Sequence, residues 1–288
     1  MILVTGAAGN NGQATLRVFA SRGVRVRALV RVEAQAPLLQ DLPGVELVVG
    51  DLAKPESLGP ALEGVERVLL ISSATPDMFE TQCAFIDAAK AAGVPHIVKL
   101  SGKESNIGFD PEKFLYTRMH AQVERYLEAS GMAWTHLRPS QFMYVYLWEA
   151  PTIAKDGVLR LAAGDIDLAP IDVDDVAKIA FHVLTTDGND GMRYEMTGPQ
   201  ALTMSEVAGI IGEVTGKPGR YVSCSPEERR ADQLAAGVPP ALCHALYDEN
   251  VERLKHPRSR VALETHKHLG IEPTTFADFI QRHKQLFL

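Results

Sequence analysis

The 288-residue sequence predicts an α/β fold, in which a doubly wound parallel sheet is followed by a smaller, mainly helical C-terminal lobe. The chain opens with a short apolar strand, a glycine-rich turn and a helix, all within its first 20 residues. Strands and helices then alternate six times before Pro139, a pattern typical of parallel sheets with helices on both faces. Beyond Pro139 this alternation ends, which indicates a smaller unit that closes over the carboxyl ends of the strands.

The individual elements follow from the apolar pattern and from helix-capping residues. The run at residues 2–4 has no polar alternation, so it is expected to be a central strand buried on both faces. Asp172 and the pair Thr203 and Glu206 have the spacing of helix N-caps. Further strands are expected at 24–30, 45–49, 67–71, 96–100, 134–137, 158–163 and 194–197, a turn at 164–170, and helices at 13–20, 55–62, 78–92, 112–130, 173–184, 203–215 and over most of 225–288. This pattern predicts a sheet domain over residues 1–150, completed by segments near 165–197, and a discontinuous capping lobe over 151–288.

Composition and charge argue against several classes of protein. The chain has 46% hydrophobic and 23% charged residues, as ordinary globular proteins do. Its net charge of −7 argues against nucleic acid as a partner, and no apolar run reaches the ~18 residues of a membrane span. Because the first strand begins at once, no signal peptide is expected. Three scattered cysteines fit reduced thiols in a cytoplasm, and His266 and His268 lie two apart on a predicted helix, so no metal site is expected.

The turn after the first strand carries three glycines at three-residue spacing, Gly6, Gly9 and Gly12. Without Cβ atoms, a pyrophosphate can approach the backbone and the helix can pack closely on the strand. The helix expected over residues 13–20 presents free N–H groups and the positive end of its dipole to an anion, with Asn10 and Asn11 in the turn before it. The sequence therefore predicts a dinucleotide-binding turn at this edge of the sheet.

Several motifs extend this prediction to a known family. The spacing T-G-A-x-G-x-x-G at residues 5–12 resembles extended and atypical short-chain dehydrogenase/reductases. Together with the segments at 50–52, 120–127, 137–143, 171–177 and 196–199, it resembles the NmrA-like branch of that superfamily, over residues 1 to about 240. This branch includes NADPH-dependent quinone and triphenylmethane-dye reductases, isoflavone-type reductases, and regulators that bind dinucleotide without turnover.

Residues at the predicted strand ends are the candidate cofactor ligands. Arg31 stands where an acidic residue would select NAD, and a guanidinium can pair with a 2′-phosphate, so NADP (NADPH) is expected, with NAD as the alternative because Glu33 lies nearby. Arg31 could also be a solvated surface residue. Asp51 resembles the family aspartate beside the adenine, or it caps the next turn. Cofactor contacts are expected for Gly6, Gly9, Asn10, Asn11, Gly12, Arg31, Asp51, Leu52, Ser72, Ser73, Ala74, Ser101, Gly102 and Pro139.

The catalytic motif departs from the superfamily pattern. The superfamily uses Tyr-x-x-x-Lys, whereas this chain has Tyr116 followed four residues later by His120, on the same helix face. His120 could donate a hydrogen bond or a proton to the substrate, since the ordinary pKa of histidine is near 6.5; alternatively it packs under the lobe. Glu124, one turn on, could orient His120 or be an ordinary surface carboxylate. Lys103 is a weaker substitute for the missing lysine. Ser101 resembles the active-site serine, or is a turn residue.

The aromatic segment after residue 139 is the candidate substrate surface. Phe142, Met143 and Tyr144 are expected to border the nicotinamide pocket and to stack on a flat substrate; the alternative is core packing between the lobes. The sequence thus predicts an NADPH-dependent reductase of a flat or conjugated small molecule, such as a quinone, enone, imine or dye. A non-catalytic NAD(P)-binding redox sensor is the main alternative, and an NADP-dependent dehydrogenase or epimerase is a third. The oligomeric state stays open.

Overall fold

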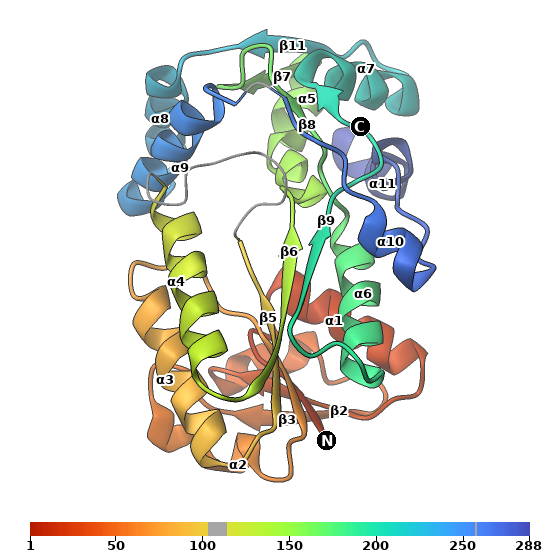
Figure 1. Ribbon diagram of the computed structural model, residues 1–288. Helices are drawn as coiled ribbons and strands as arrows, with labels where there is room; N and C mark the ends of the chain where they lie inside the picture. Colours follow the sequence, from red (N-terminus) through yellow and green to blue (C-terminus); the bar gives the residue numbers. More distant parts are fainter. Residues whose placement is uncertain (103–113, 257) are drawn as a thin grey trace.

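The computed structural model of the protein describes residues 1–102, 114–256 and 258–288. Its main feature is a seven-stranded, fully parallel sheet in the order β3-β2-β1-β4-β5-β6-β9 (Figure 1). The strands are β1 (Ile2–Val4), β2 (Val26–Val30), β3 (Val45–Val49), β4 (Arg67–Leu70), β5 (His96–Leu100), β6 (Ala133–Pro139) and β9 (Met192–Met196). The doubly wound parallel sheet predicted from the sequence is confirmed.

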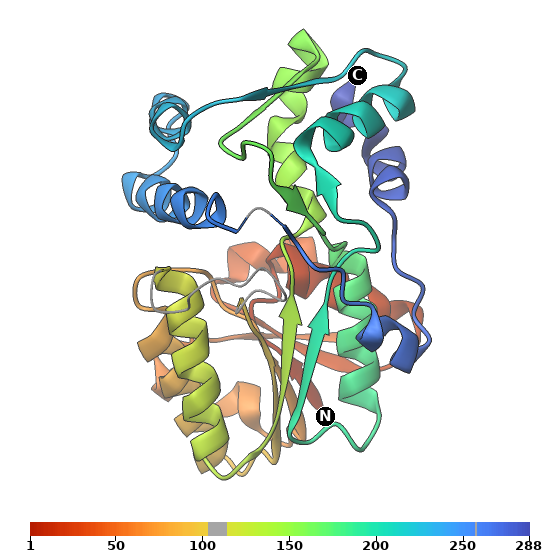
Figure 2. The same ribbon diagram turned by 45° about the horizontal axis from the view of Figure 1, so that its top comes forward.

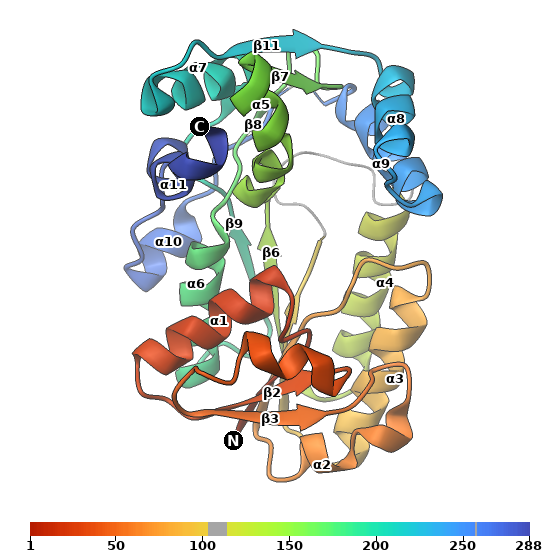
Figure 3. The ribbon, with the colours of Figure 1, turned by 180° about the vertical axis from the view of Figure 1, so that it is seen from behind.

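Helices cover both faces of this sheet (Figure 3). Apolar residues of α1 (Asn10–Ser21) and α6 (Val173–Thr185) form one core with strand side chains such as Val98 and Leu137. The opposite face packs against α2 (Gly59–Leu62), α3 (Met78–Ala91) and α4 (Leu115–Ala129). Because side chains alternate along a strand, Ile97 and Lys99 of β5 point to this second face, away from Val98.

The remaining chain forms an upper lobe above the carboxyl ends of the strands (Figures 1 and 2). Tyr146, Phe276 and Phe279 are fully buried there and pack edge to face or stacked. Two small sheets, β10-β8 and β11-β7, belong to this lobe. Its elements are η3 (Met143–Glu149), α5 (Ala150–Asp156), β7 (Val158–Leu161), β8 (Asp167–Leu168), β10 (Leu202–Thr203), α7 (Met204–Thr215), β11 (Arg220–Ser223), α8 (Pro226–Ala235), α9 (Pro240–Arg253), α11 (Phe276–His283) and η4 (Lys284–Phe287), while α10 (Glu264–Leu269) packs beside β9.

Two capping predictions are confirmed. The Asp172 carboxylate accepts the Asp174 N–H at 3.1 Å at the start of α6. At the start of α7, Thr203 and Glu206 form the complete capping box. These caps satisfy backbone donors that the first turn of a helix leaves unpaired.

Some predicted boundaries were wrong. The expected helix at 55–62 is a 3-10 turn, η2 (Pro55–Ser57), followed by the single turn of α2, because Pro60 has no N–H to donate to the carbonyl of Glu56. A further 3-10 segment, η1 (Glu33–Leu38), follows β2. The expected turn at 164–170 contains β8, which pairs with β10. Among the described residues, no helix is both long enough and apolar enough to cross a membrane.

Candidate active site

A cleft of about 760 Å³ runs along the carboxyl ends of the strands, beneath the upper lobe. Its walls come from the glycine turn, the segments that follow β2 to β6, helix α4 and helix α9. The cleft brings together most of the residues predicted from the sequence: Gly6, Gly9, Asn10, Asn11, Arg31, Asp51, Leu52, Ser72, Ser73, Ala74, Ser101, Gly102, Tyr116, His120, Pro139, Phe142 and Tyr144. Gly12 and Met143 do not line it.

The glycine turn has the shape that a bound pyrophosphate needs. Gly6 has φ +57°, and a Cβ there would lie 2.9 Å from the Ile71 carbonyl oxygen, so only glycine fits. Gly9 precedes α1 with extended backbone angles and no side-chain cap, which leaves the first N–H groups of the helix for a ligand. Gly12 does not line the cleft: a Cβ there would lie 2.4 Å from the Gly6 carbonyl oxygen, so Gly12 allows the close packing of the helix that the glycine spacing predicts.

At the carboxyl end of β2, Arg31 is exposed on the cleft wall. Its N–H donates to the Gln35 side-chain oxygen at 2.9 Å, which fixes the backbone there. Within the described ranges, no carboxylate, including that of Glu33, forms an ion pair with the Arg31 guanidinium. Asp51 lines the cleft, and its carboxylate accepts the Ala53 N–H at 3.1 Å. The residue therefore caps the turn and faces the cleft at the same time.

Tyr116 and His120 both lie on the cleft wall, one helical turn apart on α4. The ring of His120 packs against Gly102, where a Cβ would lie 2.6 Å from Nε2. The opposite ring nitrogen, Nδ1, lies 2.9 Å from Nζ of Lys99, which also donates to the Leu100 carbonyl at 3.2 Å. Lys99 therefore orients His120, a role for which Glu124 was one candidate. Lys103, the other residue considered for that role, lies outside the described residues.

Burial controls the protonation states of His120 and Lys99. It lowers the pKa of His120 well below the ordinary value, and the positive charge of Lys99 lowers it further. The ring is therefore neutral at physiological pH. Burial likewise lowers the pKa of the Lys99 amine to about 7, against the opposing charge of Glu124. Burial raises the pKa of the Tyr116 hydroxyl, which therefore stays protonated.

Glu124 is held away from His120 by a different partner. Its carboxylate accepts two hydrogen bonds from the Arg138 guanidinium, at 3.0 and 2.6 Å, and a third from the Ser101 hydroxyl. These bonds and the neighbouring positive charges lower the pKa of Glu124 although burial opposes this. Ser101 is thus buried and bonded to a carboxylate, at the floor of the cleft.

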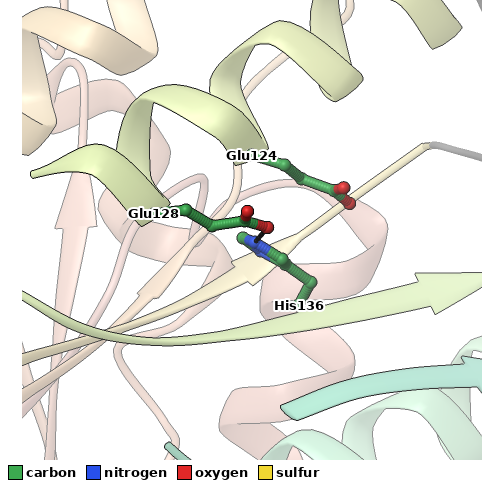
Figure 4. A group of neighbouring side chains, drawn as sticks. All are labelled: Glu124, Glu128 and His136. Carbon is green, nitrogen blue, oxygen red and sulfur yellow. Dashed lines mark hydrogen bonds and ion pairs between the residues drawn. The ribbon is translucent and has the colours of Figure 1, made fainter. Parts of the chain in front are cut away.

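Glu124 also belongs to a group with Glu128 and His136 whose potential ligand atoms lie within 4.8 Å of one another (Figure 4). Glu128 accepts hydrogen bonds from His136 at 3.0 Å and from Arg193 at 2.6 Å. Both carboxylates are therefore already neutralised by arginine partners, Arg138 and Arg193. A cation would have to displace these ion pairs, so the arrangement is that of a structural ion-pair network.

The aromatic end of the cleft is formed by residues that follow β6. Phe142 and Tyr144 stack with ring centroids 5.1 Å apart, and Trp148, 64% exposed, meets Tyr144 edge to face. The prediction for Met143 was wrong, because its side chain is 1% exposed and packs in the core of the upper lobe. In the 3-10 helix η3 successive side chains point in different directions, so neighbours of the lining residues turn inward.

Sequence reasoning missed two parts of this site. The first is Lys99, although a lysine between the apolar residues Val98 and Leu100 of a parallel strand is a signal, because such strands are buried on both faces. The second is α9, which contributes Leu242, Leu246 and Glu249 to the cleft. No local motif marks these three residues; only the path of the chain brings α9 above α4.

The parallel sheet, the glycine turn and the cleft at the strand ends, under the upper lobe, define a dinucleotide-binding protein of the Rossmann type. The model of the NmrA-like family matches residues 1–280, and the chain belongs to this family.

Relatives of known activity cover the whole chain. The NAD(P)H azoreductase of Xenophilus azovorans is 33% identical, over 100% of this chain and 99% of its own length. The structure of an NADPH-dependent quinone oxidoreductase from Escherichia coli complexed with NADPH matches with a TM-score of 0.87 at 30% identity, over 98% of this chain and 99% of the other. The Citrobacter sp. triphenylmethane reductase complexed with NADP(H) matches with a TM-score of 0.86 at 25% identity, over 99% and 100%. The chain is an NAD(P)H-dependent oxidoreductase.

Proposed function

We propose that this protein reduces a flat, conjugated small molecule, such as a quinone, enone, imine or dye, and that it prefers NADPH. The observation that carries this proposal is the aromatic end of the cleft, where Phe142, Tyr144 and Trp148 offer stacking surfaces beside His120. Stacked and exposed rings bind planar apolar molecules through their faces. The relatives support the same class, since their names refer to azo compounds, quinones and triphenylmethanes.

In this proposal, different residues along the cleft bind the cofactor, bind the acceptor and stabilise the charge that develops on the acceptor. Gly6, Gly9 and the first turn of α1 would hold the pyrophosphate, and Arg31 would hold the 2′-phosphate. When bound, the reduced nicotinamide supplies the hydride. The aromatic residues hold the acceptor, the upper lobe excludes water, and the Nε2–H of the neutral His120 donates a hydrogen bond to charge that develops on the acceptor.

A panel of acceptors tests this proposal. Purified protein is mixed with NADPH and with a quinone, an azo dye, a triphenylmethane dye, an enone or a simple aliphatic ketone, and loss of NADPH is followed optically. Turnover is expected with the conjugated acceptors and not with the ketone. Tight NADPH binding without turnover on any acceptor would indicate a redox sensor instead.

The preference for NADPH depends on Arg31. Replacing Arg31 with alanine is expected to weaken NADPH binding by roughly 1.5–3 kcal/mol and to change NADH binding little, because only NADPH carries the 2′-phosphate. Calorimetric titration of both cofactors measures the difference. Arg17→Ala, which removes an exposed arginine of α1 away from the cleft, is the matched control. Equal affinities of the unaltered protein for NADPH and NADH would contradict the assignment.

A further inference from the structure

The side chain of Lys99 is the most deeply buried cation beside the cleft. It is 0% exposed, and it lies on β5 between the sheet and helices α3 and α4. A buried ammonium is destabilising unless hydrogen bonds and opposite charges compensate it, so the position of Lys99 between apolar strand residues calls for a reason. Its closest partner is Nδ1 of His120, at 2.9 Å, and the same imidazole lines the cleft with its other nitrogen beside Gly102.

The groups around Lys99 partly compensate the charge of its ammonium, but they do not hold the amine in one protonation state. Around Lys99 lie His120 and Glu124 of α4, Cys83 of α3 and His136 of β6, the cross-strand neighbour of Lys99. Glu124 favours the protonated amine, but its carboxylate is shared with Arg138 and Ser101. Burial keeps His136 neutral and Cys83 a thiol, with pKa values of about 4 and about 11. The Lys99 amine can therefore exist charged or neutral near physiological pH, with its pKa at about 7.

The contact with Lys99 also fixes the tautomer of His120. An ammonium can only donate a hydrogen bond, so Nδ1 must accept it, and the single proton of the neutral ring must be on Nε2. This N–H group lies on the side of the ring that faces Gly102 and the cleft. Lys99 and His120 therefore form a chain of two hydrogen-bond donors: the ammonium donates to Nδ1, and the Nε2–H of the ring points to the cleft.

We propose that Lys99 is the proton reserve of the active site and reprotonates His120 as His120 protonates the reduced acceptor. The proposal rests on the reductase function proposed above. The acceptor gains a hydride from the reduced nicotinamide, and the oxygen or nitrogen that becomes anionic takes the Nε2 proton of His120. Nδ1 takes a proton from the Lys99 ammonium at the same time. Two N–H bonds break, one N–H and one O–H or N–H form, the imidazole stays neutral, and Lys99 is left as an uncharged amine.

This arrangement explains how a histidine that cannot become a stable imidazolium can still deliver a proton. A ring with a strongly lowered pKa is not protonated to the imidazolium at physiological pH, but here it only needs to pass a proton from one ring nitrogen to the other side. Lys99 acts through His120 and is a positioning residue that also stores the proton. The reverse transfer, from water in the cleft through Nε2, restores the ammonium after the product leaves.

The arrangement can be tested without any acceptor, by nitrogen NMR of the histidines at pH 6. In the wild type, the His120 signal should show an unprotonated Nδ1 and a protonated Nε2. In Lys99→Met, which replaces the amine by an uncharged chain of similar length, the His120 signal should show a mixture of tautomers. Lys155→Met, at an exposed lysine of α5, should keep the wild-type signal.

Unfolding experiments report the charge of Lys99 separately. The pKa of Lys99 is about 7 in the folded protein and 10.5 as the ordinary value, so the unfolded chain binds more protons between these values. The stability contributed by this group therefore rises with pH over that window and is smallest below pH 7. The Tm of Lys99→Met, measured relative to the Tm of the wild type, should therefore rise as the pH falls from 9 to 7. Lys155→Met should show no such trend.

Kinetics tests proton delivery itself. With a quinone, kcat of the wild type should fall as the pH rises above about 7, and Lys99→Met should lower kcat by ~10²-fold and lose this pH dependence. A cationic triphenylmethane dye accepts hydride without needing a proton, so the ratio of quinone to dye turnover should fall by ~10²-fold in Lys99→Met. The affinity for NADPH should stay within about twofold, because Lys99 is buried behind His120.

The outcomes separate this proposal from the proposed function. If no acceptor is turned over, the reductase function fails, and proton delivery fails with it, whatever the NMR result. If acceptors are reduced but the quinone pH profile and the quinone-to-dye ratio of Lys99→Met equal those of the wild type, the relay is overturned and the reductase function stands. An Nδ1-protonated His120 in the wild type at pH 6 overturns the relay as well.

Discussion

Replacing His120 with alanine is expected to lower kcat by ~10²–10⁴-fold on a quinone, with little change in NADPH affinity. His120 lies on the cleft wall with Nε2 beside Gly102, and it is the titratable residue through which the proton of Lys99 can reach the cleft. Its loss removes the hydrogen bond to the developing charge and the path for the proton together. Steady-state kinetics of the variant on one accepted quinone measures the effect.

Two further variants serve as controls for this prediction. Removing His120 leaves the buried Lys99 amine without its partner, which destabilises the fold, so the double variant Lys99→Met with His120→Ala checks that low activity does not come from unfolding. Tyr116→Phe should be milder, since no cation is seen, in the described part of the chain, to lower the pKa of Tyr116, and burial raises it. If Tyr116→Phe is inactive and His120→Ala is not, the ordinary tyrosine mechanism holds.

Gly9→Val is expected to abolish dinucleotide binding while the fold is kept. Gly9 has φ −81° and ψ 170°, angles that valine adopts readily, and an added Cβ would lie no closer than 3.3 Å to the Gly6 carbonyl oxygen. The rest of the valine side chain would then occupy the cleft in front of the first turn of α1, where we expect the phosphates to bind. Calorimetry should detect no NADPH binding, and circular dichroism should match the wild type.

Gly12→Val provides the contrast. A Cβ at Gly12 would lie 2.4 Å from the Gly6 carbonyl oxygen and 2.6 Å from Cα of Ala7, so this variant should lose stability rather than binding alone. Thermal unfolding should show a lower Tm for Gly12→Val and an unchanged one for Gly9→Val. Retained NADPH binding by a folded Gly9→Val protein would show that the phosphates lie elsewhere.

Local patterns were enough to predict those parts of the protein whose physics is local. Continuous apolar runs identified the parallel strands, since a strand covered on both faces must be apolar throughout. The caps at Asp172 and Thr203 were predictable because each bond joins residues two or three apart. The carboxyl ends of parallel strands meet at one edge, so the residues that follow the strands, such as Arg31 and Ser72, could be assigned to one cleft.

The sequence by itself determined the sheet, the glycine turn and the sheet edge at which the cleft lies, because short-range spacing and strand polarity control them. Only the tertiary structure decided which partners surround His120. Lys99 and His120 are 21 residues apart, on different elements, and Glu124 is drawn instead to Arg138 on β6. Likewise Met143 turned into the core while α9 supplied Leu242 and Leu246 to the cleft. Pairings of this kind depend on how helices pack on the sheet and on which buried charges must be compensated, and neither is set by residues that are neighbours in the chain.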